Sequence, residues 1–90
     1  MQDELEIRRK RLRFRAHHRG TKELDIFVGG FADTYLATFD SADLDAFEEI
    51  LETDEVTLYA WIAGRMPVPA NLQSEMMTLF LSYKPPAGAN

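Results

Sequence analysis

A run of apolar residues at steps of three and four is the strongest constraint on the fold of this chain. The apolar residues that recur at these steps in residues 23–39 are Leu24, Phe27, Val28, Phe31, Tyr35, Leu36 and Phe39. This spacing follows the turn of an α-helix and places these side chains on one wide face. We therefore predict a core helix over residues 23–39. Gly29 and Gly30 should together weaken it by about 2 kcal/mol, so we expect a kink or a close helix crossing there.

The segment before this helix, residues 3–18, has the pattern of a more basic helix. One face is formed by Leu5, Leu12 and the apolar stems of Arg8 and Arg15, and a second face by Ile7 and Phe14. The cations lie toward the C-terminal end, where the helix dipole favours them.

Two helical segments follow the core helix. Asp40 and Ser41 supply an N-cap for the first, whose inner face holds Leu44, Phe47, Ile50 and Leu51. The second starts after a stop at Thr53 and Asp54, and Gly64 ends it by a left-handed C-cap. Its apolar residues are Val56, Leu58, Tyr59, Trp61 and Ile62. Because they surround the helix almost completely, we expect burial on more than one side.

A last helix is predicted between two groups of prolines. Pro69 fits its first turn, and Pro85 with Pro86 stops it. Its predicted inner face holds Leu72, Met76, Leu79, Phe80 and Tyr83. No stretch alternates at period two over the length of a strand. The predicted fold class is all-α, a compact small bundle of about five helices in a single domain over residues 1–90, with residues 84–90 as a flexible tail.

The net charge of -5 is spread unevenly. Residues 1–22 hold eight Lys or Arg and three acids, whereas residues 23–90 hold two and twelve. A basic block of this kind can form an electrostatic contact surface for nucleic acid, an acidic protein or a phosphate-bearing cofactor. It can also simply solvate a helix. The chain has no cysteine, which excludes disulfides, and no apolar run long enough to insert into a membrane.

The stretch Arg19-Gly20-Thr21-Lys22-Glu23 joins the basic segment to the core helix. Gly20 fits the residue that ends the first helix with a positive φ angle. It also fits a bare backbone patch that another molecule can approach. Arg19 and Glu23 are four residues apart, so they can pair or face a partner together. The two interpretations are compatible.

No catalytic or metal motif is recognisable. His17 and His18 are adjacent, so on a helix they point about 100° apart and cannot chelate one metal ion together. Glycine-rich phosphate loops and nucleophile motifs are absent from the sequence. An enzyme would need a site built from His17, His18, Glu23 and Asp25, with no predicted pocket to shield it. We therefore expect a binding module without catalytic activity and without a metal.

Two stretches resemble one family. Arg19-Gly20-Thr21-Lys22-Glu23-Leu24-Asp25 is similar to the R-G-x-x-E-L-D signature of the succinate dehydrogenase assembly factor 2 family, the small FAD assembly factors of proteobacteria and mitochondria. Leu51-Glu52-Thr53-Asp54, followed by Leu58-Tyr59-Ala60-Trp61, resembles the L-E-x-D-D-x-x-L-x-x-W block of that family, with Glu55 where an Asp is common. The similarity covers nearly the whole chain, including Met76-Met77.

The resemblance implies a five-helix protein that binds the flavoprotein subunit of succinate dehydrogenase, and also that of fumarate reductase, and promotes covalent attachment of FAD to it. The bond-forming chemistry would belong to the flavin and the client, so no cofactor need be bound tightly here. By resemblance Arg19, Gly20 and Glu23 contact the client, together with Asp25 and Arg15. The missing transit peptide favours the bacterial cytoplasm, and we expect a monomer when the protein is free.

An alternative function comes from a different class. Members of this family have also carried an antitoxin label, and a basic helical domain could act on nucleic acid or on a toxin protein. The acidic residues 23–90 argue against nucleic acid, because they would repel phosphates beyond the first helix.

Overall fold

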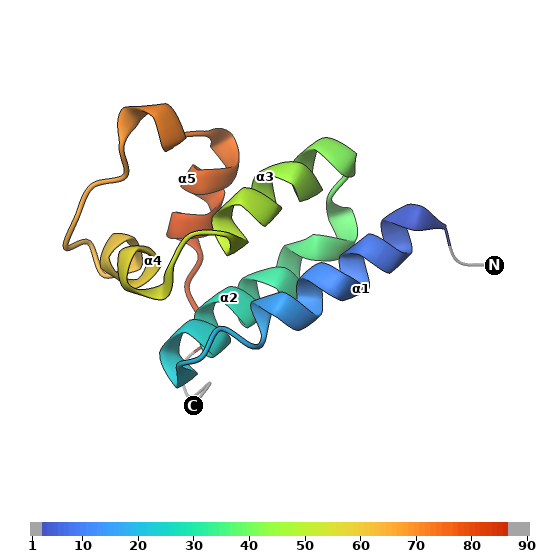
Figure 1. Ribbon diagram of the computed structural model, residues 1–90, viewed down its shortest axis with the longest axis horizontal. Helices are drawn as coiled ribbons and strands as arrows, with labels where there is room; N and C mark the ends of the chain where they lie inside the picture. The colour runs from blue at the N-terminus through green and yellow to red at the C-terminus, as the bar shows by residue number, and fades with distance from the viewer. Residues whose placement is uncertain (1–2, 87–90) are drawn as a thin grey trace.

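The computed structural model describes residues 3–86, which form five α-helices and two short 3-10 helices (Figure 1). The elements are α1 (Glu4–Ala16), α2 (Lys22–Tyr35), η1 (Leu36–Thr38), α3 (Ser41–Leu51), α4 (Glu55–Ile62), η2 (Ala70–Leu72) and α5 (Glu75–Ser82). No strand occurs within this described range. The predicted all-α fold of five helices is confirmed. Residues 87–90 of the predicted tail lie outside the described residues.

The hydrophobic core is centred on α2. Helix α1 packs against both α2 and α3, and α5 packs against α3, while α4 lies at one end of the molecule (Figure 1). The ring of Phe31 on α2 lies 5.5 Å from that of Phe47 on α3 and 5.2 Å from that of Phe80 on α5, and all three are fully buried. The core-helix prediction is therefore confirmed, although the α-helix ends at Tyr35 and the chain continues through η1.

The two glycines of α2 provide room for side chains from other segments. A Cβ atom at Gly29 would collide with the ring of His17, and one at Gly30 would collide with the hydroxyl of Tyr83. Helix α2 continues through both positions. The prediction was a kink or a close helix crossing, whereas the close approach at these glycines is made by two side chains that rest on the helix.

Acidic and hydroxyl side chains cap most helices, as the sequence indicated for the third and fourth. Asp40 caps α3 and forms a capping box with Asp43, and Asp54 caps α4. Gly64 has φ +73°, and the amide that follows it, that of Arg65, donates to Ala60 O at 2.9 Å. This is the hydrogen bond expected of a left-handed helix end.

Three expectations about the helix ends and faces are wrong. Helix α1 ends at Ala16, so Gly20 lies in the following turn and does not terminate the helix. The last helix begins at Glu75 with Ser74 as its cap, and Pro69 instead precedes η2. Leu72 belongs to η2 and is exposed. The Ser74 hydroxyl accepts the amide of Met77 at 3.0 Å, and this side-chain cap places the start of α5 after Ser74 instead of at Pro69.

Helix α4 is covered on one side only. Leu58 and Trp61 are buried, but Val56 is 80% exposed and Tyr59 is 40% exposed. The prediction of burial on more than one side is therefore wrong, because α4 lies at the end of the bundle where no further helix covers it (Figure 1). Within residues 3–86, no helix has both the length and the apolar character needed to cross a membrane.

Candidate functional site

The inner arginines of α1 bind α3. Arg8 Nη2 lies 2.7 Å from Asp45 Oδ1 and 2.8 Å from Glu48 Oε1, and Arg15 Nη1 lies 3.1 Å from Glu48 Oε2. The hydrogen bond from Arg8 holds the pKa of Glu48 below its usual range. Part of the basic block therefore stabilises the packing of α1 on α3.

Other cations of α1 remain on the surface. Lys10 and Arg11 are exposed and form no ion pair within residues 3–86. The cations of α1 thus divide into an inner set of arginines that pair within the protein and an outer pair, Lys10 and Arg11, that is accessible to a partner. Arg15, a predicted client-binding residue, belongs to the inner set.

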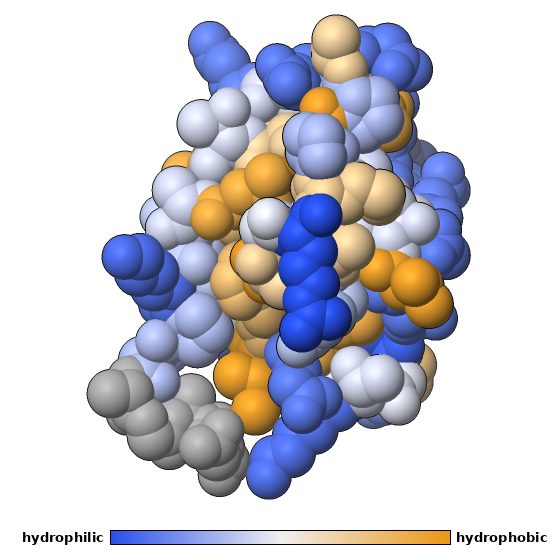
Figure 2. All heavy atoms as spheres, turned by 90° about the vertical axis from the view of Figure 1, so that its left-hand side faces the viewer, coloured by the Kyte–Doolittle hydropathy of each residue, from blue (hydrophilic) through white to orange (hydrophobic). Residues whose placement is uncertain are grey.

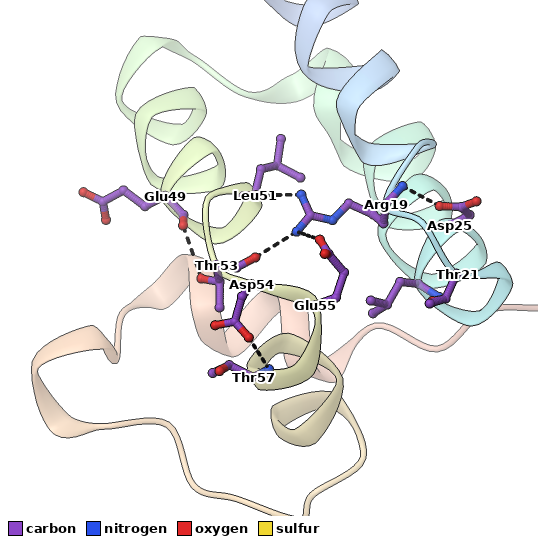
Figure 3. Close-up of polar contacts among 10 residues, drawn as sticks. Arg19, Thr21, Asp25, Glu49, Leu51, Thr53, Asp54, Glu55 and Thr57 are labelled. Atoms are coloured by element: carbon purple, nitrogen blue, oxygen red, sulfur yellow. Dashed lines mark hydrogen bonds and ion pairs between the residues drawn. The ribbon is translucent and has the colours of Figure 1, made fainter.

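Arg19 connects the turn between α1 and α2 to the turn between α3 and α4 (Figure 3). Its guanidinium donates to Leu51 O at 2.6 Å and to Thr53 O at 2.8 Å, and it pairs with Glu55 at 3.1 Å. Only 7% of the side chain is exposed. The expected pairing of Arg19 with Glu23 is therefore replaced by a pairing with Glu55.

The two sequence blocks that resemble one family meet at Arg19. Asp25 accepts the backbone N–H of Arg19 at 2.6 Å, which closes the turn from the side of α2. Asp54 accepts the amide of Thr57 at 3.0 Å, and this cap lowers the pKa of Asp54 (Figure 3). The acceptors for Arg19 come from the block around Leu51. Sequence analysis did not foresee this connection, because backbone carbonyls leave no signal in a residue pattern.

Gly20 and Glu23 are presented to solvent by this fixed turn. Gly20 has φ +108°, and no other atom lies within 4 Å of the place where a Cβ would be. Thr21 caps α2 by accepting the amide of Leu24 at 3.2 Å. Glu23, in the first turn of α2, is exposed and forms no ion pair within residues 3–86. Of the predicted site residues, these two are therefore the most accessible.

An open groove of about 440 Å³ lies beside Glu23, between the start of α2 and α4. We call it the α2–α4 groove. On this side of the molecule, hydrophobic residues lie on both sides of a strongly hydrophilic side chain that crosses the middle of the view, and hydrophilic residues lie toward the edges (Figure 2). Sequence reasoning missed the groove, since it expected α4 to be buried. The side chains that line it include Thr21, Glu23, Glu55, Val56, Tyr59 and Arg65.

The two histidines have separate surroundings. His17 Nε2 lies 3.0 Å from Asp33 Oδ1, and the ring of His18 stacks on Phe14 with centroids 4.0 Å apart. Over residues 3–86, no group of three or more His, Cys, Asp or Glu side chains is placed to hold a metal ion. The turn around Arg19 and the α2–α4 groove together form the candidate binding surface.

Comparison with known proteins gives consistent results. The sequence family described as "Flavinator of succinate dehydrogenase" (Sdh5) matches residues 10–84. The chain is 42% identical over 76 residues to the "FAD assembly factor SdhE" of Acetobacter pasteurianus, covering 84% of this chain and 70% of that protein. It is 28% identical over 81 residues to "Succinate dehydrogenase assembly factor 2, mitochondrial" of Drosophila grimshawi, covering 88% of this chain and 55% of that one. The chain therefore spans about half the length of that mitochondrial relative.

Proposed function

This chain belongs to the family of succinate dehydrogenase flavinators, and on that premise we propose that it binds the flavoprotein subunit of succinate dehydrogenase and promotes covalent attachment of FAD to it. The fumarate reductase flavoprotein is a second client of the same kind. We also propose that the protein acts as a monomer in the bacterial cytoplasm, and its similarity to the FAD assembly factor SdhE of Acetobacter pasteurianus supports the bacterial setting.

The observation that supports this function most directly is the geometry of the turn. Arg19 is almost buried and holds two turns together, whereas Gly20 and Glu23 beside it are exposed. Contacts within the protein already hold this turn in place, while Gly20 and Glu23 stay exposed. Such a surface suits docking, because little conformational freedom is lost on binding. Arg19 and Asp25 then support the site, and Gly20 and Glu23 contact the client.

In this proposal the protein positions the client and contributes no reacting group. Bringing two reactants into alignment, or stabilising a minor conformation of the client, is enough to accelerate bond formation. We therefore propose that the protein is not an enzyme and does not hold FAD tightly. The flavin and a histidine of the client carry out the bond-forming step.

Nucleic acid is a less suitable partner. Half of the ten Lys and Arg residues form ion pairs within the molecule, and the net charge of -5 disfavours phosphates. The paired residues are Arg8, Arg9, Arg13, Arg15 and Arg19. A gel shift with random duplex DNA at low salt should show no retarded band. A retarded band that disappears on reversing Lys10 and Arg11 would favour the regulatory alternative.

The first prediction tests the proposal at Gly20. Gly20→Ala and Gly20→Arg both place a side chain at φ +108°, and each should cost about 1 to 2 kcal/mol of stability. Only the arginine should also block docking, because space around the position is open in the free protein. We expect Gly20→Arg to stay folded and to fail to raise covalent flavin on the purified flavoprotein subunit, measured by protein-bound flavin fluorescence in a denaturing gel.

Gly20→Ala is the matched control, with the same backbone strain and little bulk, and it should retain most of the activity. Glu23→Ala should also stay folded, since an exposed acid in a first helical turn contributes at most about 1 kcal/mol, and it should lose activity. Wild-type levels of covalent flavin with both folded Gly20→Arg and Glu23→Ala would show that this turn does not contact the client.

A further inference from the structure

Helix α4 leaves apolar surface uncovered next to the turn. Val56 and Tyr59 both line the α2–α4 groove, and Val56 is among the most exposed large apolar residues of the described chain. A groove of about 440 Å³ is large enough for a few side chains of a partner. Nothing in the packing of residues 3–86 requires this surface to be apolar, because Leu58 and Trp61 already anchor the helix.

The charges around the groove are unevenly satisfied. Glu55 is neutralised in part by Arg19 at 3.1 Å, and the guanidinium carbon of Arg65 lies 5.6 Å from the centre of the Tyr59 ring. Glu23 has no ion-pair partner within residues 3–86. Arg65 likewise forms no ion pair within residues 3–86, but its guanidinium is placed over the Tyr59 ring. Glu23 is therefore the carboxylate of the groove lining that has no cation beside it, and it shares the groove with the apolar side chains of α4.

We propose that the α2–α4 groove takes a segment of the client flavoprotein that carries an apolar side chain next to an Arg or Lys. The apolar side chain packs on Val56 and Tyr59, and the cation pairs with Glu23. This inference rests on the proposed function. It adds that α4 forms part of the docking surface, and it specifies the chemistry of the bound segment.

Charge complementarity selects this occupant over others. The unpaired carboxylate of Glu23 beside apolar side chains attracts a cationic group. Glu23 and Glu55 together outnumber Arg65, the cation of the lining, so lipid phosphates and nucleic acid fit less well. An arginine on the client could also donate one hydrogen bond to each carboxylate oxygen of Glu23. A second copy of this chain would have to offer an exposed cation, such as Lys10 or Arg11 of α1, to the groove. Sedimentation velocity of the free protein tests that alternative.

The test compares three substitutions at one position. Val56→Ser, Val56→Glu and Val56→Lys alter an exposed residue, so all three should fold, as checked by circular dichroism. Affinity for the purified flavoprotein subunit is then measured by biolayer interferometry. Val56→Ser should bind about tenfold more weakly than the wild type. Val56→Lys should bind more weakly still, because it repels the client's cation, and Val56→Glu should bind better than Val56→Lys.

Ile7→Ser is the matched control. Ile7 is also an exposed aliphatic residue, 43% accessible, but it lies on α1 outside the groove. It should bind within about twofold of the wild type, as expected for a surface change outside an interface. Tyr59→Ser should repeat the effect of Val56→Ser from the next turn of α4.

Each remaining outcome overturns a defined part of the inference. Wild-type affinity in all Val56 variants, with binding lost in Glu23→Ala, would exclude the wall of α4 and leave the proposed function intact. Weaker binding by Val56→Glu than by Val56→Lys would show that the occupant is acidic. A dimer of the free protein that Val56→Lys dissociates would assign the groove to a second copy. A wild-type protein that does not bind the flavoprotein at all would refute the proposed function, and this inference with it.

Discussion

At the scale of single residues, Arg19 and Glu23 have opposite environments although one motif contains both. The guanidinium of Arg19 is enclosed by acceptors from residues 51–55, more than thirty positions away in the chain. Glu23 is exposed at the groove. Substitution of Arg19 should therefore affect function through stability, whereas substitution of Glu23 should affect it through contact.

The second prediction concerns Arg19→Lys. A lysine ammonium cannot reproduce the planar set of donors that reaches Leu51 O, Thr53 O and Glu55. At least one partly buried carbonyl would lose its partner, which should lower the free energy of unfolding by about 1 to 3 kcal/mol. Urea denaturation measures the change. Arg65→Lys, at an exposed arginine, is the control and should stay within about 0.5 kcal/mol of the wild type. Equal stability of both variants would contradict the structural role of Arg19.

At the scale of elements, α1 and α3 are joined by ion pairs centred on Glu48. Arg8 and Arg15 approach its two oxygens from α1. Their charge lowers the pKa of Glu48 in the folded state, with the hydrogen bond from Arg8 as the largest cause. Because the unfolded chain then takes up the proton first as the pH falls, this contact stabilises the fold above the ordinary glutamate pKa of about 4.3 and is lost below it.

The third prediction follows from the lowered pKa of Glu48 in the folded state. Stability should fall as the pH drops from 7 through the depressed pKa of Glu48, and Glu48→Gln should be less stable than the wild type at neutral pH. Below the lowered pKa of Glu48 its side chain is protonated and resembles glutamine, so the two proteins should converge there. Urea denaturation across this range tests it. A constant difference between the two proteins at every pH would assign the effect of Glu48→Gln to packing instead of charge.

The fourth prediction separates the inner and outer cations of α1. Arg8→Glu should lower the melting temperature, because it places a third acid beside Asp45 and Glu48. Arg11→Glu removes an exposed cation and should leave the melting temperature almost unchanged. If the outer cations steer docking, Arg11→Glu should slow association with the flavoprotein at low salt, and the difference should shrink as salt screens the charges. Association rates that change neither with salt nor in Arg11→Glu would show that the outer cations do not steer docking and serve only solubility.

At the scale of the whole molecule, α4 is attached at one end of the bundle. Leu58 and Trp61 anchor it to the core, and Arg19 anchors the turn that precedes it. These contacts connect the groove to the same core that α2 organises. The groove should therefore be lost and regained together with the rest of the fold.

The fifth prediction tests this cooperativity. Trp61 is the only tryptophan, so its fluorescence reports α4 alone, whereas far-ultraviolet circular dichroism reports all helices. The two thermal transitions should coincide in the wild type. In Arg19→Ala the fluorescence transition should move to a lower temperature, and it should move ahead of the dichroism if Arg19 is the main attachment of α4. A fluorescence transition well below the dichroism in the wild type would show that α4 unfolds independently.

The helices and most of their caps could be predicted from the sequence because both depend on neighbours in the chain. Leu24, Phe31 and Tyr35 follow the helical period, and Asp40 and Asp54 bind amides three residues away. The family could also be identified locally, since its two motifs are short and contiguous. At this level, the sequence prediction was wrong about the end of α1, which lies at Ala16, and about the start of α5, which Ser74 caps.

The tertiary structure alone decided which of these residues are accessible. An apolar helix such as α4 has no local sign of which side will be covered, because coverage depends on helices from other parts of the chain. Likewise, Arg19 could reach Glu23 on one helix face or Glu55 across the fold. The two partly buried carbonyls beside Glu55, Leu51 O and Thr53 O, make the distant pairing the more favourable one. The amino-acid sequence thus determined the helices and the motif residues, while long-range packing determined that Arg19 supports the turn and that Gly20, Glu23, Val56 and Tyr59 face solvent.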